Sequence, residues 1–351
     1  MKKAGIWLVF FSLTLIACVD EIYLEVPAAE SNLVIDAWLG PSTDQSYVRV
    51  YRSAPFLSGT INPSYTKVPV ARMYFEDESG QKTYLFNIPD TTLFYRTQHF
   101  KEFETGKKYR LNVLTRTEEE YQSDWVVMPE PSVVEKMDVI PREKPVIVYS
   151  SGVPLTVNAV VADLNLSISN PSGEEVGFFI ETDGISEVFT TGDSENCICN
   201  CYRPVPAMYG GMNLESSKYE QGNRSSVKVG ELSVTSLGRF YTESIVKTVS
   251  RDNLGYLEQI NKQQRSTGSI FDPAPFKIKG NIKSLTEPDK EVMGNFMVFQ
   301  ETTFSQMLYR AEIFRQNPQM NFAFEPTQHV GFYCGTYYTD ALPYTPEPFQ
   351  P

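Results

Sequence analysis

The stretch Lys108-Tyr109-Arg110-Leu111-Asn112-Val113-Leu114 decides the fold. Its polarity alternates, so Tyr109, Leu111 and Val113 share one face at the period of two that is typical of a β-strand. Apolar residues resume at 121–127 after a polar run. The pattern therefore predicts a strand with one buried face that pairs with the following segment.

Similar short runs precede this strand. They lie at residues 32–39, 47–52, 68–75 and 82–86, and the turn after Phe75 contains Asp77-Glu78-Ser79-Gly80, which predicts a hairpin. Several short strands in about 100 residues, separated by Gly and Pro turns, are typical of an immunoglobulin-like sandwich. We therefore predict an Ig-like β-sandwich over residues 32–128, which ends at the stiff spacer Pro129-Glu130-Pro131.

The remaining residues predict a second β-rich domain over 132–342, so the expected fold class is mainly all-β. Asp252-Asn253 is expected to cap a helix in which Leu254, Leu257 and Ile260 repeat at helical spacing, which predicts one helix over 252–265. Two further segments are expected to be irregular: a cysteine-containing loop over 191–225, rich in Gly, Ser and Asn, and a Pro-rich loose tail over 343–351.

The N-terminus has the features of a bacterial lipoprotein signal. Lys2 and Lys3 precede a short apolar run, and a small residue, Ala17, stands directly before Cys18. Residues 1–17 are therefore predicted to be a signal peptide, Cys18 to carry lipid, and 18–31 to form a tether. The alternative is an ordinary secretory signal followed by a coincidental cysteine.

Composition excludes some classes of function. The chain has 31 Lys and Arg against 43 Asp and Glu, a formal net charge of −12. No basic cluster is present, so a nucleic-acid partner is not expected, because phosphate contacts need grouped Lys or Arg. No second long apolar run follows Cys18, so we expect no helix that crosses a membrane.

Four cysteines remain if Cys18 takes lipid: Cys197, Cys199, Cys201 and Cys334. In an oxidising compartment an even number favours disulfides, and sequence cannot separate the three possible pairings. Closure between neighbours of the C-x-C-x-C trio is strained, so we expect Cys334 to pair with one of its members. A four-sulfur metal site is the alternative, although one intervening residue suits structural zinc poorly.

Residues that would support catalysis are scarce. The only histidines are His99 and His329, no G-x-S-x-G motif is present, and the acidic clusters lie in predicted turns. We therefore expect no catalytic residues, no metal and no cofactor. A hydrolase with an unusual carboxylate site remains the less favoured alternative.

Several motifs carry a resemblance to a known family. They are "LVIDAWL" (33–39), "VPVARMYFEDESG" (68–80), "GKKYRLNVL" (106–114), "GSIFDPAPFKIKGNI" (268–282) and "VMGNFMVF" (292–299). Together with the signal and the cysteine cluster, they resemble the Bacteroidota lipoproteins classed as domain of unknown function 4249. Val19-Asp20-Glu21 also looks like the surface-export signals of such lipoproteins. The resemblance implies an outer-membrane lipoprotein encoded beside a TonB-dependent receptor, with no established activity.

The predicted function is therefore a non-enzymatic accessory or binding partner of a TonB-dependent transporter in nutrient uptake. The protein would be lipid-anchored in the outer membrane and exposed at the cell surface, and the ligand stays open. Residues 191–225 and 268–282 are the candidate contact surfaces. The alternative is a structural or adhesive envelope protein whose sandwich domains act as spacers.

Overall fold

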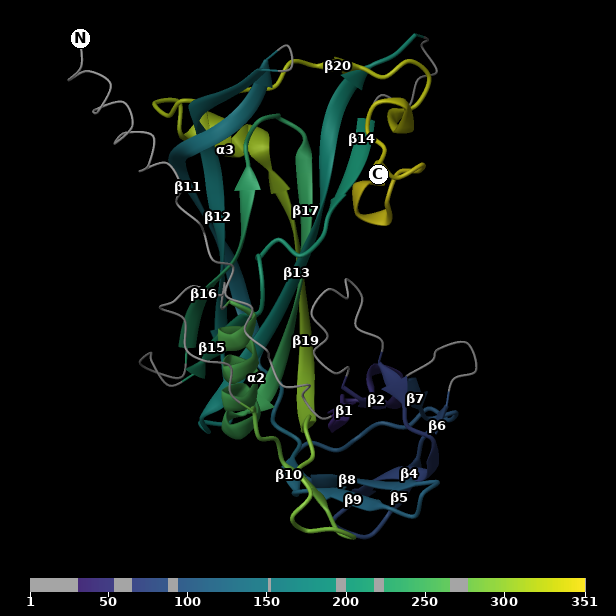
Figure 1. Cartoon of the computed structure of the whole chain (residues 1–351). Helices are drawn as coiled ribbons and strands as arrows, with labels where there is room; N and C mark the ends of the chain where they lie inside the picture. Colours follow the sequence, from purple (N-terminus) through teal and green to yellow (C-terminus); the bar gives the residue numbers. More distant parts are fainter. Residues whose placement is uncertain are drawn as a thin grey trace, which may run out of the picture.

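The computed structural model describes residues 31–53, 65–87, 94–150, 153–193, 200–217, 224–265 and 277–350. These residues form three hydrogen-bonded sheets and two α-helices (Figure 1). The predicted fold class, mainly all-β with sandwich-like packing, is confirmed.

The strands before residue 129 have at most eight residues, whereas several after it have ten or more. The first set comprises β1 (Leu33–Leu39), β2 (Tyr47–Arg52), β3 (Thr66–Lys67), β4 (Val70–Asp77), β5 (Lys82–Tyr84), β6 (Phe86–Asn87), β7 (Phe94–Arg96), β8 (Lys108–Thr115), β9 (Glu120–Ser123) and β10 (Val126–Val127). The second set comprises β11 (Val133–Ser150), β12 (Val153–Ser169), β13 (Val176–Thr191), β14 (Asn200–Val205), β15 (Asn213–Ser216), β16 (Arg224–Ser233), β17 (Arg239–Ser250), β18 (Ile282–Ser284), β19 (Phe296–Tyr309) and β20 (Gln328–His329). The α-helices are α2 (Arg251–Gln264) and α3 (Arg310–Gln316).

The N-terminal sandwich packs β1, β2 and β7 against a sheet of order β18-β9-β8-β4-β5. Tyr109, Leu111 and Val113 of β8 are all buried, so the predicted inward face of this strand is confirmed. Side chains of β1 alternate in the same way, with Ile35 and Ala37 fully buried. Alternate residues of β8 and β1, which belong to the two facing sheets, thus point into the shared core.

Two strands from the far end of the chain complete this sandwich. The start of β19 lies parallel to β1, with Ala37 opposite Phe296 and Leu39 opposite Val298. β18 extends the facing sheet by pairing with β9. Phe296 is fully buried and stacks on Phe75, with ring centroids 5.8 Å apart. Segments that the sequence assigns to the second domain therefore contribute to the core of the first.

The second sandwich packs β11, β12 and β16 against β13, β17 and β19. β11 and β12 form a long antiparallel hairpin, with Val133 opposite Ser169 and Ser150 opposite Val153. β11 is an edge strand, which explains how it accommodates Pro141 inside the strand.

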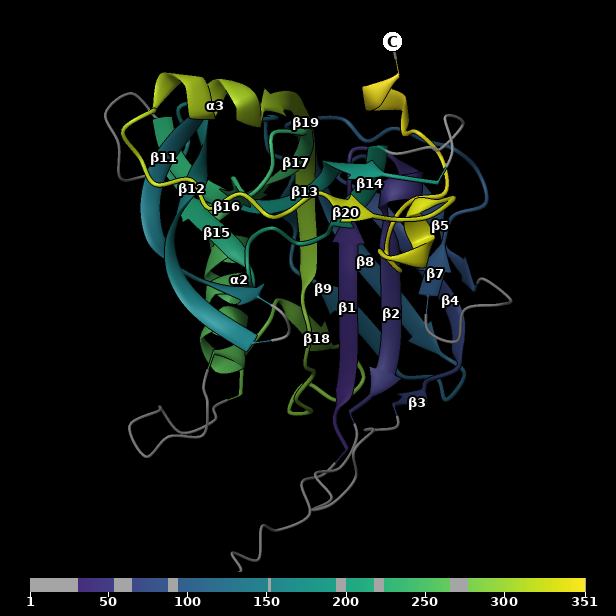
Figure 2. The same ribbon diagram turned by 90° about the horizontal axis from the view of Figure 1, so that it is seen from above.

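One sheet serves both sandwiches. Its order is β14-β13-β17-β19-β1-β2-β7-β6, so β19 is the strand that joins the two halves. Figure 1 shows β19 running from the upper sandwich down to the lower one, and Figure 2 shows β1 and β2 beside it. The two predicted units are therefore continuous through their backbone hydrogen bonds.

The predicted helix over 252–265 is confirmed as α2, within one residue at each end. Its N-cap is Ser250, whose hydroxyl accepts a hydrogen bond from the Asn253 backbone N–H at 3.3 Å, rather than the expected Asp252-Asn253 pair. Leu254 and Leu257 are buried where α2 contacts β13, β15 and β17.

A second helix corrects the expectation of one helix. β19 ends at Tyr309, and α3 begins at the next residue. Arg310 and Ile313 are both buried, and a spacing of three places them on one helical face. The seven-residue helix is too short to leave a clear periodic signal.

Two segments expected to be irregular are ordered by contacts distant in sequence. Residues 200–205 and 213–216 of the predicted loop form β14 and β15, which pair with different stretches of β13. In the segment predicted as a loose tail, Phe349 is 3% exposed and its ring centroid lies 4.9 Å from that of Tyr202.

Two glycines allow the chain to cross close to β1. A Cβ on Gly294, whose φ is +98°, would lie 2.0 Å from the carbonyl oxygen of Ile35. A Cβ on Gly280 would lie 1.7 Å from the carbonyl oxygen of Gly294. Both contacts are shorter than van der Waals separation, so the approach of residues 280–294 to β1 requires glycine at each position.

Replacing Gly294 with alanine should lower the free energy of unfolding by about 1–3 kcal/mol, because the side chain demands both a strained φ and a displaced backbone. Urea unfolding followed by tryptophan fluorescence measures this loss. Gly80→Ala is the matched control, since Gly80 has a φ of +83° with no atom within 4 Å of the added Cβ. Equal losses in the two variants would contradict a role for the close approach.

Candidate functional site

The structure joins two of the predicted cysteines. Cys201 on β14 and Cys334 form a disulfide with a Cα–Cα distance of 5.5 Å. This confirms the expectation that Cys334 pairs with one of the trio, and it removes two thiolates from the alternative four-sulfur metal site. Cys18, Cys197 and Cys199 lie outside the described residues, as do residues 268–276 of the second candidate contact surface.

The disulfide braces the C-terminal segment against β13 and β14. Cys201 is fully buried, and Cys334 is 7% exposed. Nearby, the Leu342 backbone N–H donates to the Tyr202 carbonyl at 2.8 Å, and Arg203 forms a bidentate pair with Asp340. Part of the predicted 191–225 surface is therefore held in place by residues more than 100 positions later.

The two histidines lie apart from each other in different settings. His99 is exposed at a bend. His329 on β20 contacts the Asp193 carboxylate through Nε2 at 2.7 Å and the Thr191 hydroxyl through Nδ1 at 3.3 Å. His329 and Asp193 are each about half exposed, so this group of three side chains is surrounded by water. In such a setting, fixed protein dipoles do little to stabilise the charge that develops in a catalytic transition state. We interpret these contacts as structural, because they connect β20 to the end of β13.

The acidic clusters hold turns together. Asp77 accepts hydrogen bonds from the backbone N–H groups of Ser79 and Gln81, at 3.0 and 2.9 Å. Glu119 pairs with Lys290, which ties the β8–β9 turn to the segment after β18. These contacts give the carboxylates structural partners across turns.

A buried ion pair lies between β13 and β17. Glu187 is 1% exposed and accepts hydrogen bonds from Nε, Nη2 and the backbone N–H of Arg239, each at 2.9 Å. Burial raises the pKa of Glu187, but the hydrogen bonds from Arg239 outweigh it and hold the pKa below the ordinary 4.5. The pair is therefore ionised at neutral pH.

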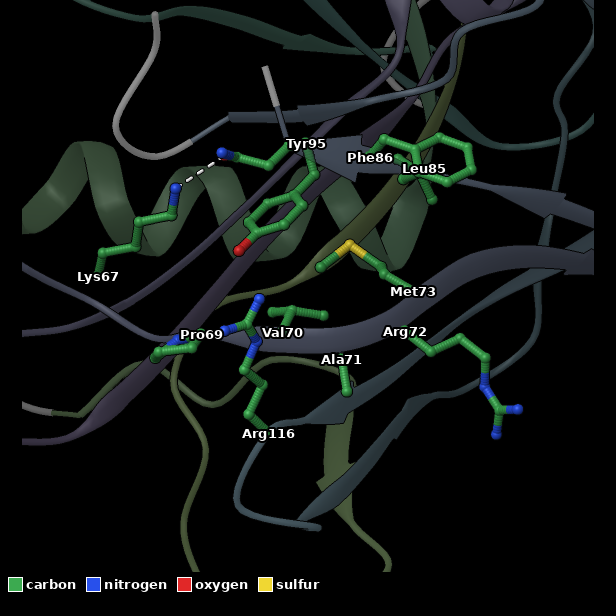
Figure 3. Close-up of a pocket in the computed structure, with 11 residues that line it drawn as sticks. Lys67, Pro69, Val70, Ala71, Arg72, Met73, Leu85, Phe86, Tyr95 and Arg116 are labelled. Carbon is green, nitrogen blue, oxygen red and sulfur yellow. Dashed lines mark hydrogen bonds between the residues drawn. The ribbon is translucent and has the colours of Figure 1, made fainter. Parts of the chain in front are cut away.

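A cationic groove of about 380 Å³ opens on the N-terminal sandwich between the start of β4 and strands β6 and β7 (Figure 3). Lys67, Arg72 and Arg116 line it, and none of its lining residues is acidic. Figure 3 shows the Arg116 guanidinium beside Pro69 and Val70, whereas Arg72 lies farther along the same segment and extends away from Arg116.

The cations of this cationic groove are short of anionic partners. Lys67 donates to the Asn87 side-chain oxygen at 2.8 Å, a neutral acceptor. Among the described residues, neither Arg72 nor Arg116 forms an ion pair. Three cations line this groove without an acidic residue among its lining, which in a chain of net charge −12 favours an anionic partner at this position.

The cationic groove lies close to the point where the N-terminal tether would join the body. Leu33 at the start of β1 is opposite Arg52 on β2, and Arg52 is opposite Thr66 on β3. Neighbouring strands are about 4.8 Å apart, so Lys67 lies only about 10 Å from the start of β1. Lys67, Arg72 and Arg116 are separated in the sequence and do not form a basic cluster, so the cationic groove could not be predicted from the sequence alone.

Two further features bear on binding. Within the described residues, no group of three or more His, Cys, Asp or Glu side chains is placed to hold a metal ion. Neither α2 nor α3, the helices of that part of the chain, has the length and apolar character needed to cross a membrane.

These features define an all-β protein of two sandwiches built on one shared sheet, with a cationic groove beside its N-terminal strand. A family model described as a domain of unknown function (DUF4249) matches residues 19–305. The chain belongs to this family, and the resemblance drawn from its motifs is confirmed at that level. No curated protein and no solved structure matches the chain.

Proposed function

We propose that this protein is a lipid-anchored lipoprotein of the outer membrane, exposed at the cell surface, that acts without catalysis as an accessory of a TonB-dependent transporter in nutrient uptake. The observation that carries the proposal is the N-terminal signal: Lys2 and Lys3, the short apolar run, and Ala17 before Cys18. Lipid on Cys18 would confine the body to the membrane surface.

The tether sets how far the body can lie from that surface. Twelve residues separate Cys18 from Ser31. Fully extended, they reach about 45 Å. A partner in the same membrane therefore meets the protein at high effective concentration, and weak contacts suffice for association.

Family membership and the cationic groove support the transporter as partner. The motifs that resemble the family imply a gene beside a TonB-dependent receptor. Lys67, Arg72 and Arg116 lie on the N-terminal sandwich, near the end of the tether, where an envelope partner is within reach. We take the cationic groove as the contact surface for that partner.

The test is affinity isolation of the full-length protein from cross-linked outer membranes, with proteins identified by mass spectrometry. We expect recovery of a TonB-dependent receptor. Arg72→Glu/Arg116→Glu should reduce that recovery at least about tenfold, because each reversal replaces attraction with repulsion. Recovery of no receptor with the native protein would contradict the proposal.

Two controls accompany this experiment. Lys136→Glu/Arg315→Glu makes the same charge change at two exposed positions of the second sandwich and should leave recovery unchanged. Cys18→Ser should take up no labelled palmitate and should leave the membrane fraction. An adhesive spacer would instead retain the membrane label and recover glycans or host proteins without a transporter.

A further inference from the structure

A second cavity, of about 310 Å³, opens in the second sandwich. β13, β14, the segment between β16 and β17, and the first residue of α3 all contribute to it. Val205, Met208, Leu232 and Phe240 supply apolar walls. The volume and the mixture of apolar and polar lining residues suit a small organic molecule that carries charged groups.

Arg310 provides a buried cation in this cavity. Its side chain is 4% exposed, and its guanidinium donates to three neutral acceptors: the carbonyl oxygens of Gly238 at 2.7 Å, Arg239 at 3.4 Å, and Glu187. Burial lowers the pKa of Arg310 to about 10, so it stays charged at neutral pH. Within the described residues no carboxylate forms an ion pair with it, and its Nη1 donates no hydrogen bond.

Ser236 adds an unpartnered polar atom to the same cavity. Its hydroxyl oxygen is buried and makes no hydrogen bond in the described structure. Buried hydroxyls are nearly always satisfied, so one that lines a cavity indicates an acceptor or donor that arrives from within it. Ser236 lies two residues before Gly238, whose carbonyl holds Arg310.

Most other charges around the cavity are already neutralised. Arg203 is paired with Asp340, and Glu231 contacts Arg142, Lys144 and Lys228. Glu325 is different: it is exposed, and no hydrogen bond or ion pair to its carboxylate is present among the described residues. The cavity thus offers a buried cation, Arg310, which the Glu187 and Glu325 carboxylates attract from a distance without an ion pair to either, an exposed anion, Glu325, at its rim, and an apolar part of its wall.

We propose that this cavity binds a small aliphatic α-amino acid. The ligand carboxylate is held by Arg310 and the Ser236 hydroxyl, its ammonium group faces Glu325, and its side chain packs on Leu232 and Phe240. An ionised carboxylate supplies both a directly contacting anion for Arg310, whose hydrogen-bond acceptors are all carbonyl oxygens, and an acceptor for the Ser236 hydroxyl. The assignment goes beyond membrane attachment and does not depend on it.

Isothermal titration calorimetry of the full chain in detergent tests this proposal with three probes that share the isobutyl side chain of leucine. L-leucine carries both charged groups, 4-methylpentanoate lacks the ammonium group, and 3-methylbutylamine lacks the carboxylate. We expect L-leucine to bind most tightly, 4-methylpentanoate a few-fold more weakly, since Glu325 is exposed, and 3-methylbutylamine not measurably. No binding of L-leucine or 4-methylpentanoate at millimolar concentration would overturn the proposal.

Variants separate the site from general effects on stability. Ser236→Ala should weaken L-leucine binding about tenfold, the value of a hydrogen bond to a charged group, without changing the fold. Arg310→Gln should abolish binding, and Arg315→Gln, on the exposed side of the same helix, should not alter it. If 3-methylbutylamine binds as tightly as L-leucine, or Ser236→Ala binds L-leucine as the native chain does, the assignment is wrong.

Discussion

Removing the Cys201–Cys334 disulfide by Cys201→Ser/Cys334→Ser should lower the free energy of unfolding by about 4 kcal/mol. The bond spans 133 residues of sequence, so it removes many open conformations from the unfolded chain. It also holds the C-terminal segment, in which Phe349 packs on Tyr202. Urea unfolding at matched protein concentration measures the loss.

A second measurement locates the effect of the disulfide. Limited proteolysis of the double variant should release fragments that begin after Val330, because the segment then depends on single contacts such as the Arg203–Asp340 pair. Adding reductant should lower the stability of the native protein and leave that of the variant unchanged. An unaltered urea midpoint in the variant would show that the bond contributes no stability.

Replacing Arg239 with alanine should lower the free energy of unfolding by about 3 kcal/mol, because it leaves the Glu187 carboxylate buried and without its cation. We expect the lower end of the usual range, since the Arg239 side chain is 33% exposed. Arg203→Ala is the matched control. Its partner Asp340 is 46% exposed, so breaking that pair should cost under about 1 kcal/mol.

The Glu187–Arg239 pair also predicts a pH dependence. The pKa of Glu187 is lowered in the folded state, so its contribution to stability is complete above the ordinary value of 4.5 and is lost as the pH falls through the lowered value. The native protein should therefore lose stability in acid more steeply than Arg239→Ala. If the free energy of unfolding falls equally steeply with decreasing pH in both proteins, the assigned role of the pair is wrong.

Local patterns explain what sequence predicted well. The alternation of Tyr109, Leu111 and Val113 is a property of one strand, and the buried face follows from it directly. The spacing of Leu254 and Leu257 likewise defines α2 without reference to the rest of the chain. In both cases the apolar period and the final burial agree, because one neighbouring layer is enough to cover the face.

The parts of the fold that could not be predicted depend on pairing between strands that are distant in the sequence. β14 and β15 contain few apolar residues, and β13 orders them through backbone hydrogen bonds. Phe296 completes a core that was otherwise predicted to end at residue 128. The motif over 292–299 contributes to the family resemblance, but nothing in its residues identifies β1 as the parallel neighbour of β19.

The candidate binding sites show the same limit. Lys67, Arg72 and Arg116 meet only when three strand ends converge, so no basic run marks the cationic groove. Glu187 and Arg310 are charged residues with apolar neighbours in the sequence. That pattern is the sequence feature that indicates a buried charge at these positions. The pairing of Cys334 with one of the trio was predictable from the strain of closing adjacent cysteines, whereas the choice of Cys201 was not.

The position of β1 bears on how the protein carries load. β1 is the first strand after the proposed tether, and it lies inside its sheet, hydrogen-bonded to β2 on one side and to β19 on the other. With the proposed lipid anchor on Cys18, a pull on that anchor would act along this strand and load those hydrogen bonds together in shear. A peripheral strand would instead peel away one bond at a time. Under the proposed anchoring, the folded body would therefore resist unfolding from its N-terminus when fluid drag pulls on it.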